Sequence, residues 1–249
     1  MVTATQAKQR PVIIRDEKIK IVAGMVRSRM KLMRLLQLTS SNLPVGGYTF
    51  SQGLEYAIDA NWISSEQDVT QWIEHTARST LGCTDLPLMI RQFNCSDNDT
   101  DKSHYWNDVS MATRESKEML AADRAMGAAL VRLANSMNLS LPAYCLQPDA
   151  NVSYITIYSL LACGFSIQLE EAAAGYSWAL IENQVLAATK LLPMGQTSAQ
   201  QILFELSDIV DECIETSLEV RDDDIGLGLP GLAMASALHE TQYSRLYRS

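Results

Sequence analysis

The stretch RESKEMLAADRAMGAALVRLANSM, from Arg114 to Met137, decides the fold class of this chain. Apolar residues return in it every three or four positions, which is the spacing of one face of an α-helix. Arg114 and Glu118 stand one turn apart, and we expect both on the opposite, solvated face. A helix with one apolar face must bury that face, so the stretch predicts a protein of packed helices. The apolar positions are Met119, Ala122, Met126, Leu130, Leu133 and Met137.

A second helical pattern lies between residues 64 and 85. Ser64 and Gln67 have the spacing of a capping box, which marks the start of a helix. Asp85 is predicted to cap a further helix, because Pro87 follows in the first turn, where the missing N–H of proline is tolerated. The stripe between these caps consists of Val69, Trp72, Ile73, Thr76, Ala77, Thr80 and Leu81.

Residues 151–192 are mostly apolar, and we expect them near the centre of the fold. The segment YITIY, 154–158, has the composition of a strand, but its Ala-rich neighbours and the absence of a hairpin signal favour a helix. LPMGQTS, 192–198, then breaks the chain, and Thr197 or Ser198 could cap the next helix. Without a repeat or a long linker, the sequence predicts a single-domain, all-α helical bundle. The stripe of the helix after the break consists of Ile202, Leu203, Leu206, Ile209, Val210, Cys213 and Ile214.

The charge of the chain is unevenly distributed. Residues 1–34 contain nine lysines and arginines and two acidic residues, a net charge of +7, whereas the whole chain carries −9. A basic arm on an acidic body is compatible with an adaptor for nucleic acid or membranes. No aromatic platform or groove-binding motif accompanies the charge, so we interpret residues 1–30 as a solvated basic extension that could be disordered.

Cysteine usage indicates a reducing compartment. The five cysteines are widely spaced and form no C-x-x-C pair, which is unlike a disulfide framework. Residues 1–30 lack the uninterrupted apolar core of a signal peptide. Residues 150–169 carry no charge, but their polar content and acidic flanks are untypical of a membrane span. We therefore expect a cytoplasmic protein without a membrane partner. The cysteines are Cys83, Cys95, Cys145, Cys163 and Cys213.

The sequence shows no catalytic or nucleotide-binding motif in its usual context. GLGLPG, 226–231, has the spacing G-x-G-x-x-G, but it follows an acidic run rather than a strand, and we interpret it as a flexible hinge. His75, His104 and His239 lie far apart, without an H-E-x-x-H pair. We therefore assign no catalytic, metal-binding or cofactor-binding residue. The enzymatic alternative is an all-α, metal-dependent hydrolase with scattered His and Asp ligands.

Three stretches place unusual residues together. LPVGGYTFSQGLEYA, 43–57, joins a sharp glycine loop to Tyr48 and Phe50, which could pack back onto the core. WALIENQVLAATKLLPMGQ, 178–196, carries polar residues inside an apolar run, and these need partners within the fold or across an interface. HETQYSRLYRS, 239–249, gathers aromatic, aliphatic and cationic residues at a chain end, where small polar residues are usual.

Four blocks of the sequence together resemble the UreF family of urease accessory proteins. The resemblance is colinear from about residue 33 to residue 249, and residues 1–30 lie outside it. One departure is Tyr247, where the family usually has Phe in a final R-L-F-R-S. The blocks are LLQLTSSNLPVGGYTFSQGLE (35–55), RESKEMLAADRAMGAALVRLA (114–134), KLLPMGQTSAQQIL (190–203) and HETQYSRLYRS (239–249).

The resemblance implies an all-α homodimer that acts as a scaffold rather than as an enzyme. Proteins of this family join UreD, also called UreH, and the GTPase UreG into a complex that activates apo-urease by inserting nickel. Nickel and GTP are then handled by the complex, and this chain has no cofactor of its own. No nucleic-acid partner is expected.

The resemblance also implies a division of the chain. Residues 31–225 form the helical domain, and residues 226–249 form a hinge and a tail that docks on UreD/UreH. Lys190 faces UreG or urease and could modulate the GTPase, or it is a core or dimer contact. The expected partner-binding residues of the tail, rich in the anchors that interfaces favour, are Tyr243, Ser244, Arg245, Leu246, Tyr247, Arg248 and Ser249. Those of the body are Gly46, Gly47, Tyr48, Lys190, Pro193, Gly195 and Gln196.

Overall fold

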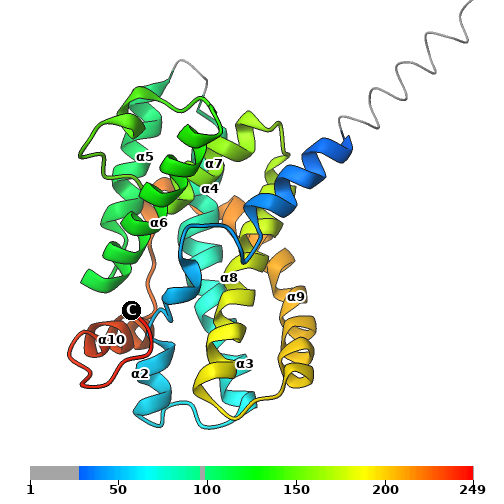
Figure 1. The fold of residues 1–249 in the computed structure, drawn as a ribbon, viewed down its shortest axis with the longest axis vertical. Coiled ribbons are helices and arrows are strands. Elements are labelled where there is room, and N and C mark those ends of the chain that lie inside the picture. The colour runs from blue at the N-terminus through cyan, green and yellow to red at the C-terminus, as the bar shows by residue number, and fades with distance from the viewer. Residues whose placement is uncertain (1–27, 96–98, 249) are drawn as a thin grey trace, which may run out of the picture.

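Helix α8, Leu169–Leu191, runs through the middle of the molecule (Figure 1). The computed structural model describes residues 28–95 and 99–248, and these residues form helices and turns without a strand. The predicted all-α fold is thereby confirmed. The other elements are the helix at 28–38, η1 (Gly47–Thr49), α2 (Leu54–Asp59), α3 (Glu66–Ala77), η2 (Arg78–Asp85), α4 (Leu86–Phe93), α5 (Thr100–Ala112), α6 (Lys117–Ser136), η3 (Ala143–Leu146), α7 (Tyr154–Gly164), α9 (Gln196–Glu219), η4 (Asp222–Asp224) and α10 (Pro230–His239).

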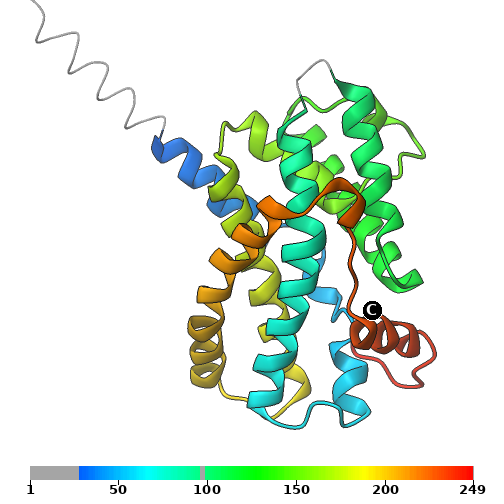
Figure 2. The same ribbon diagram turned by 180° about the vertical axis from the view of Figure 1, so that it is seen from behind.

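The long helices form two groups, and α4 contacts members of both. Helices α3, α8 and α9 lie side by side in one half, and α5, α6 and α7 lie in the other (Figures 1 and 2). The helix at 28–38 extends outward from the body. Its last turn approaches α8 at Gly175, where a Cβ atom would lie 2.7 Å from side-chain carbons of Leu35 and Thr39. Only a residue without a side chain permits this close approach.

The segment 154–158, which has the composition of a strand, is helical, as its context predicted. It forms the first part of α7, where the Ser153 side chain caps the helix by accepting the N–H of Thr156 at 3.1 Å. Ile155, Ile157 and Tyr158 have no exposed surface. The apolar run 151–192 is central because α7 packs on α5 and α6 in one group, α8 packs on α3 and α9 in the other, and both contact α4.

The start of α3 lies one residue later than the capping-box spacing predicted. Ser65 and Asp68, rather than Ser64 and Gln67, form the box. The Ser65 hydroxyl oxygen accepts the N–H of Asp68 at 3.1 Å, and the Asp68 carboxylate accepts the backbone N–H groups of Ser64 and Ser65, both at 2.9 Å. These hydrogen bonds stabilise the charged carboxylate and lower the pKa of Asp68 below its ordinary value.

Asp85 directly precedes α4, as predicted, but its side chain makes no capping hydrogen bond. The chain is helical without a break from α3 to α4, and η2 between them is a π-helical segment. The Asp85 carboxylate instead accepts hydrogen bonds from Arg114 Nη1 at 2.9 Å and from the Tyr176 hydroxyl at 2.7 Å. The predicted caps of α9 are also wrong, because α9 begins at Gln196 and Gly195 precedes it without a side-chain cap.

Arg114 and Glu118 do not lie on a solvated face, and this expectation is wrong as well. Arg114 precedes α6, and its buried guanidinium donates to Asp85 at 2.9 Å and to Asp123 at 3.3 Å. Burial lowers the pKa of Arg114, but the charges of Asp123 and Asp85 outweigh burial and raise it above the ordinary value. The side chain of Glu118 is also largely buried, against the end of the chain.

The last part of the chain returns to the body. In the predicted hinge, 226–231, the Gly226 N–H donates to the carbonyl of Cys83 at 3.1 Å, and the Ser79 hydroxyl donates to the carbonyl of Leu227 at 3.1 Å. Helix α10 follows, within the segment predicted to be a hinge and a tail. It packs on α2 and α6, and the chain then turns back so that its end lies beside α2 (Figure 1).

Two sequence features fall partly outside the described residues. Of the basic extension 1–30, only residues 28–30 are described, and they belong to the helix at 28–38. Of the polar stretch 95–104, residues 96–98 are outside the description. Its second half is helical, because α5 begins at Thr100 with Asp99 as its N-cap.

Candidate docking surface

The glycine loop before α2 buries one of its two aromatic residues and exposes the other. Gly46 has a positive φ of 76°, a conformation that glycine adopts without strain, and the chain reverses there into η1. Phe50 packs into the core, whereas Tyr48 is 59% exposed. Packing back onto the core therefore describes Phe50 but not Tyr48.

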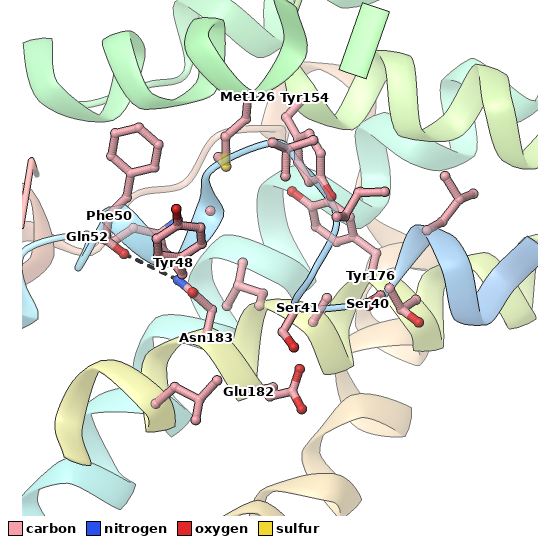
Figure 3. Close-up of a pocket in the computed structure, with 18 residues that line it drawn as sticks. Ser40, Ser41, Tyr48, Phe50, Gln52, Met126, Tyr154, Tyr176, Glu182 and Asn183 are labelled. Atoms are coloured by element: carbon pink, nitrogen blue, oxygen red, sulfur yellow. Dashed lines mark hydrogen bonds between the residues drawn. The ribbon is translucent and has the colours of Figure 1, made fainter. Parts of the chain in front are cut away.

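A pocket lies between this loop and α8 (Figure 3). Its volume is about 100 Å³, and its walls are mostly apolar. Tyr48 and Met126 line it together with Tyr154 and Tyr176 (Figure 3). Glu182 on α8 also lines it, and partial burial raises the pKa of the Glu182 carboxyl. The pocket is thus a small apolar hollow that contains a carboxylate, beside an exposed tyrosine.

Two of the polar residues within α8 find partners in the loop. The Asn183 side chain donates to the carbonyl of Phe50 at 3.3 Å (Figure 3). The Gln184 side chain donates to the carbonyl of Ser51 at 3.2 Å and to Gln52 Oε1 at 3.3 Å. These polar residues of α8 therefore fasten the glycine loop to the helix. They find their partners within the fold rather than across an interface.

The carboxy-terminal tail, defined here as residues 240–248, binds to its own body through Glu55. One carboxylate oxygen of Glu55 accepts the backbone N–H of Leu246 at 2.6 Å, and the other accepts that of Tyr247 at 2.9 Å. The next backbone N–H, of Arg248, donates to the carbonyl of Thr49 in the glycine loop at 2.9 Å. Three successive amides of the tail are therefore satisfied by α2 and by the loop before it.

Side chains add to this attachment. Tyr247 is only 7% exposed, and the Lys190 ammonium lies 6.0 Å from the centre of its ring. Arg245 Nη1 donates to Glu118 Oε1 at 2.7 Å. The imidazole of His239 is completely buried, with Nε2 3.0 Å from Glu55 Oε2 and Nδ1 2.7 Å from Glu118 Oε2. The tail is thus held by two glutamates from different helices, with a histidine between them.

Other tail side chains face away from the body. Tyr243 is fully exposed and Leu246 is 64% exposed, although both are large and apolar enough to be expected in a core. Ser244 and Arg248 are exposed too, and Ser249 lies outside the described residues. Exposed aromatic and aliphatic side chains on an ordered backbone are typical of surfaces that receive another protein.

The structure brings together some of the predicted partner-binding residues but not all. The tail lies next to two of these predicted sites. Arg248 donates to the carbonyl of Thr49 in the glycine loop of Gly46, Gly47 and Tyr48, and the Lys190 ammonium lies against the ring of Tyr247. Pro193, Gly195 and Gln196 are exposed in the connection between α8 and α9 and at the start of α9. Within the described part of the chain no hydrogen bond joins these three residues to the loop or tail.

Sequence reasoning missed Glu55, Glu118 and His239, although each is central to the attachment of the tail. Glu55 follows the glycine loop at a position that no pattern marked, and Glu118 was assigned to a solvated face. A histidine and two glutamates more than sixty residues apart carry no local signal. The single clue was His239 at the start of a terminal block that gathers unusual residues.

Two further observations bear on the class of protein. Residues 28–95 and 99–248 contain no group of three or more His, Cys, Asp or Glu placed to hold a metal ion. Over the same ranges, no helix combines the length and the apolar character that crossing a membrane requires. What the described residues do present is an ordered helical body with an apolar pocket and exposed aromatic side chains.

These features define a helical protein with an exposed candidate docking surface. The profile of the UreF family matches residues 63–207. A urease accessory protein UreF from a Marinomonas species is 41% identical over 230 residues, covering 92% of this chain and 99% of that protein. Another from Alkalilimnicola ehrlichii is 42% identical over 217 residues, covering 87% of this chain and 95% of that protein. The chain belongs to the UreF family of urease accessory proteins, as its four blocks indicated.

Proposed function

We propose that this protein is a non-catalytic scaffold of urease maturation. It joins UreD/UreH and the GTPase UreG into the complex that activates apo-urease, working in the cytoplasm as a homodimer. Nickel and GTP are handled by the assembled complex rather than by a cofactor of this chain. Membership of the family supports the place in urease maturation.

The observation that carries the scaffold role is the arrangement of the tail. Its backbone is fixed by Glu55 while Tyr243 and Leu246 remain exposed. A partner that covers these two side chains does not have to order their backbone first, so less conformational entropy is lost on binding. We assign this face to UreD/UreH.

The second face of the scaffold is formed by Tyr48, the pocket beside it, and Lys190. Tyr48 is exposed next to an apolar hollow with a carboxylate, an arrangement that suits an apolar side chain flanked by a basic one. We assign this face, together with Pro193, Gly195 and Gln196, to UreG or apo-urease. Lys190 is exposed, so it is not a core lysine.

The experiment is co-purification of the full chain with UreD/UreH and UreG. Replacing both Tyr243 and Leu246 by Ala should strongly reduce recovery of UreD/UreH. The control is Tyr105→Ala on α5, because Tyr105 is 59% exposed and belongs to neither face. Undiminished recovery with the double variant would refute the assignment of the tail, and turnover of a small compound by the isolated chain would refute the scaffold.

A further inference from the structure

The hydrogen bonds of His239 require one proton more than a neutral histidine supplies. A neutral imidazole has one N–H group and one lone pair, and an ionised carboxylate only accepts hydrogen bonds. Both ring nitrogens of His239 nevertheless face carboxylate oxygens, at 2.7 Å from Glu118 and at 3.0 Å from Glu55. Either the imidazole carries two protons or one of the two carboxyl groups is protonated.

The charges around this cluster balance only when that proton is present. Glu55 faces the imidazole from α2, and Glu118 faces it from α6. Arg245 of the tail pairs with Glu118, and Lys190 of α8 lies on the far side of Tyr247. With the extra proton, Glu55, Glu118, His239 and Arg245 sum to zero. Without it, the cluster has a charge of −1 and a histidine lone pair points at a carboxylate, which is unfavourable where no water reaches.

The two carboxylates that contact His239 also hold the tail. Glu55 accepts hydrogen bonds from the backbone N–H groups of Leu246 and Tyr247, and Glu118 accepts one from the guanidinium of Arg245. We infer that Glu55, Glu118 and His239 form a proton-dependent binding site for a peptide segment, whose occupant is residues 245–248 of this chain. When the proton is lost as the pH rises, the two glutamates separate from the imidazole and the tail is released. This inference goes beyond the scaffold role and does not depend on it.

The test measures amide hydrogen exchange in the full-length chain between about pH 5.5 and about pH 8.5, the range in which histidine clusters commonly titrate. Exchange at Leu246 and Tyr247 is compared at each pH with a free peptide of the same sequence, which corrects for the intrinsic effect of pH. We expect protection of these two amides to fall by about tenfold or more across the range. Exchange in α9 serves as the internal reference for global unfolding.

Glu118→Gln is the decisive variant. Its amide oxygen can still accept from Arg245, and its NH₂ group can donate to a neutral His239, so the site no longer needs the extra proton. The tail should then stay protected across the whole range. Glu55→Gln should lose protection at every pH, because its NH₂ group would face a tail N–H. Glu66→Gln removes the same charge at the exposed start of α3, away from the cluster and the tail, and should keep the wild-type profile.

Two results would overturn the inference. One is a wild-type protection, corrected for intrinsic exchange, that does not change with pH. The other is a Glu118→Gln variant that loses protection over the same range as the wild type. Either result is interpretable when the amides of α9 remain protected from exchange. A variant that unfolds globally would lose that protection and would be recognised by it.

Discussion

The carboxylate of Glu55 lies 2.9 Å from the backbone nitrogen of Tyr247, 192 residues further along the chain. This contact joins α2, which follows the glycine loop, to the carboxy-terminal tail. It determines which side of the tail is available, because Tyr247 turns inward while Leu246 beside it turns outward. Two adjacent residues of one motif thus have different roles.

Tyr247→Phe should leave the stability of the protein unchanged or raise it by about 1 kcal/mol. The Tyr247 hydroxyl is buried without a hydrogen-bond partner among the described residues, so its removal relieves a desolvated polar group. The control is Tyr158→Phe, whose hydroxyl donates to the carbonyl of Ala172 at 3.1 Å and whose loss should cost about 1 kcal/mol. Urea unfolding measures both, and a larger loss for Tyr247→Phe would contradict the prediction.

Arg114→Met should destabilise the protein by about 3–5 kcal/mol. The change leaves the buried carboxylates of Asp85 and Asp123 without their shared cation. Arg221→Met is the matched control, because Arg221 pairs with Asp224 at the exposed surface, and it should give no measurable change. Thermal and urea unfolding are the measurements. Equal losses of stability in the two variants would show that the buried ion pairs of Arg114 do not stabilise the fold more than a surface ion pair does.

Asp68→Asn should make the free energy of unfolding depend less steeply on pH in the acidic range. Hydrogen bonds from Ser64 and Ser65 lower the pKa of Asp68 below 3.8, so the folded state holds this proton less tightly than the unfolded chain. The stabilisation is fully present above pH 3.8 and is lost as the pH falls through the lowered pKa. The measurement is unfolding by urea at a series of acidic pH values. An unchanged slope in the variant would disprove the role of this cap.

Lys190→Ala should reduce recovery of UreG with the complex while leaving the tail in place. The ring of Tyr247 lies 6.0 Å from the ammonium, the outer limit of a cation–π contact, so its loss should cost the tail only about 0.5 kcal/mol. Co-purification reports the first effect, and amide exchange at Tyr247 reports the second. Unchanged UreG recovery and unchanged urease activation would remove Lys190 from the docking residues.

Helical periodicity was sufficient to predict the all-α fold class, because an apolar stripe along a helix marks the face that must be buried. It located the helices α3, α6 and α9, and the neighbours of YITIY favoured a helix where α7 lies. It missed α5, whose residues are mostly polar, and α10, whose residues are mostly small and apolar, because neither helix carries a clear apolar stripe. Helix ends were displaced because Ser64 and Ser65 are equivalent in a sequence and differ only in backbone conformation.

Charged residues were the least predictable. Arg114 has the spacing of an exposed ion-pairing residue, yet it is buried between two carboxylates that approach it from η2 and α6. Glu118 and Glu55 likewise acquire their partners from the far end of the chain. Spacing along a helix describes neighbours on that helix alone, whereas these partners are brought together by packing. The candidate surface could therefore be located by its glycine and aromatic residues, but its attachment could not.

The π-helical segment η2 affects how the fold responds to the deletion of a single residue. A π turn contains more residues than an α turn. Residues 78–85 can therefore hold an extra residue while α3 and α4 on either side keep the same faces buried. Loss of one residue within this segment can be accommodated by a return to α-helical geometry, with the faces of α3 and α4 preserved. The same loss within α8 would rotate everything beyond it by about 100°. A one-residue deletion should therefore be tolerated at η2, where the helix can change its geometry, but not within a regular helix.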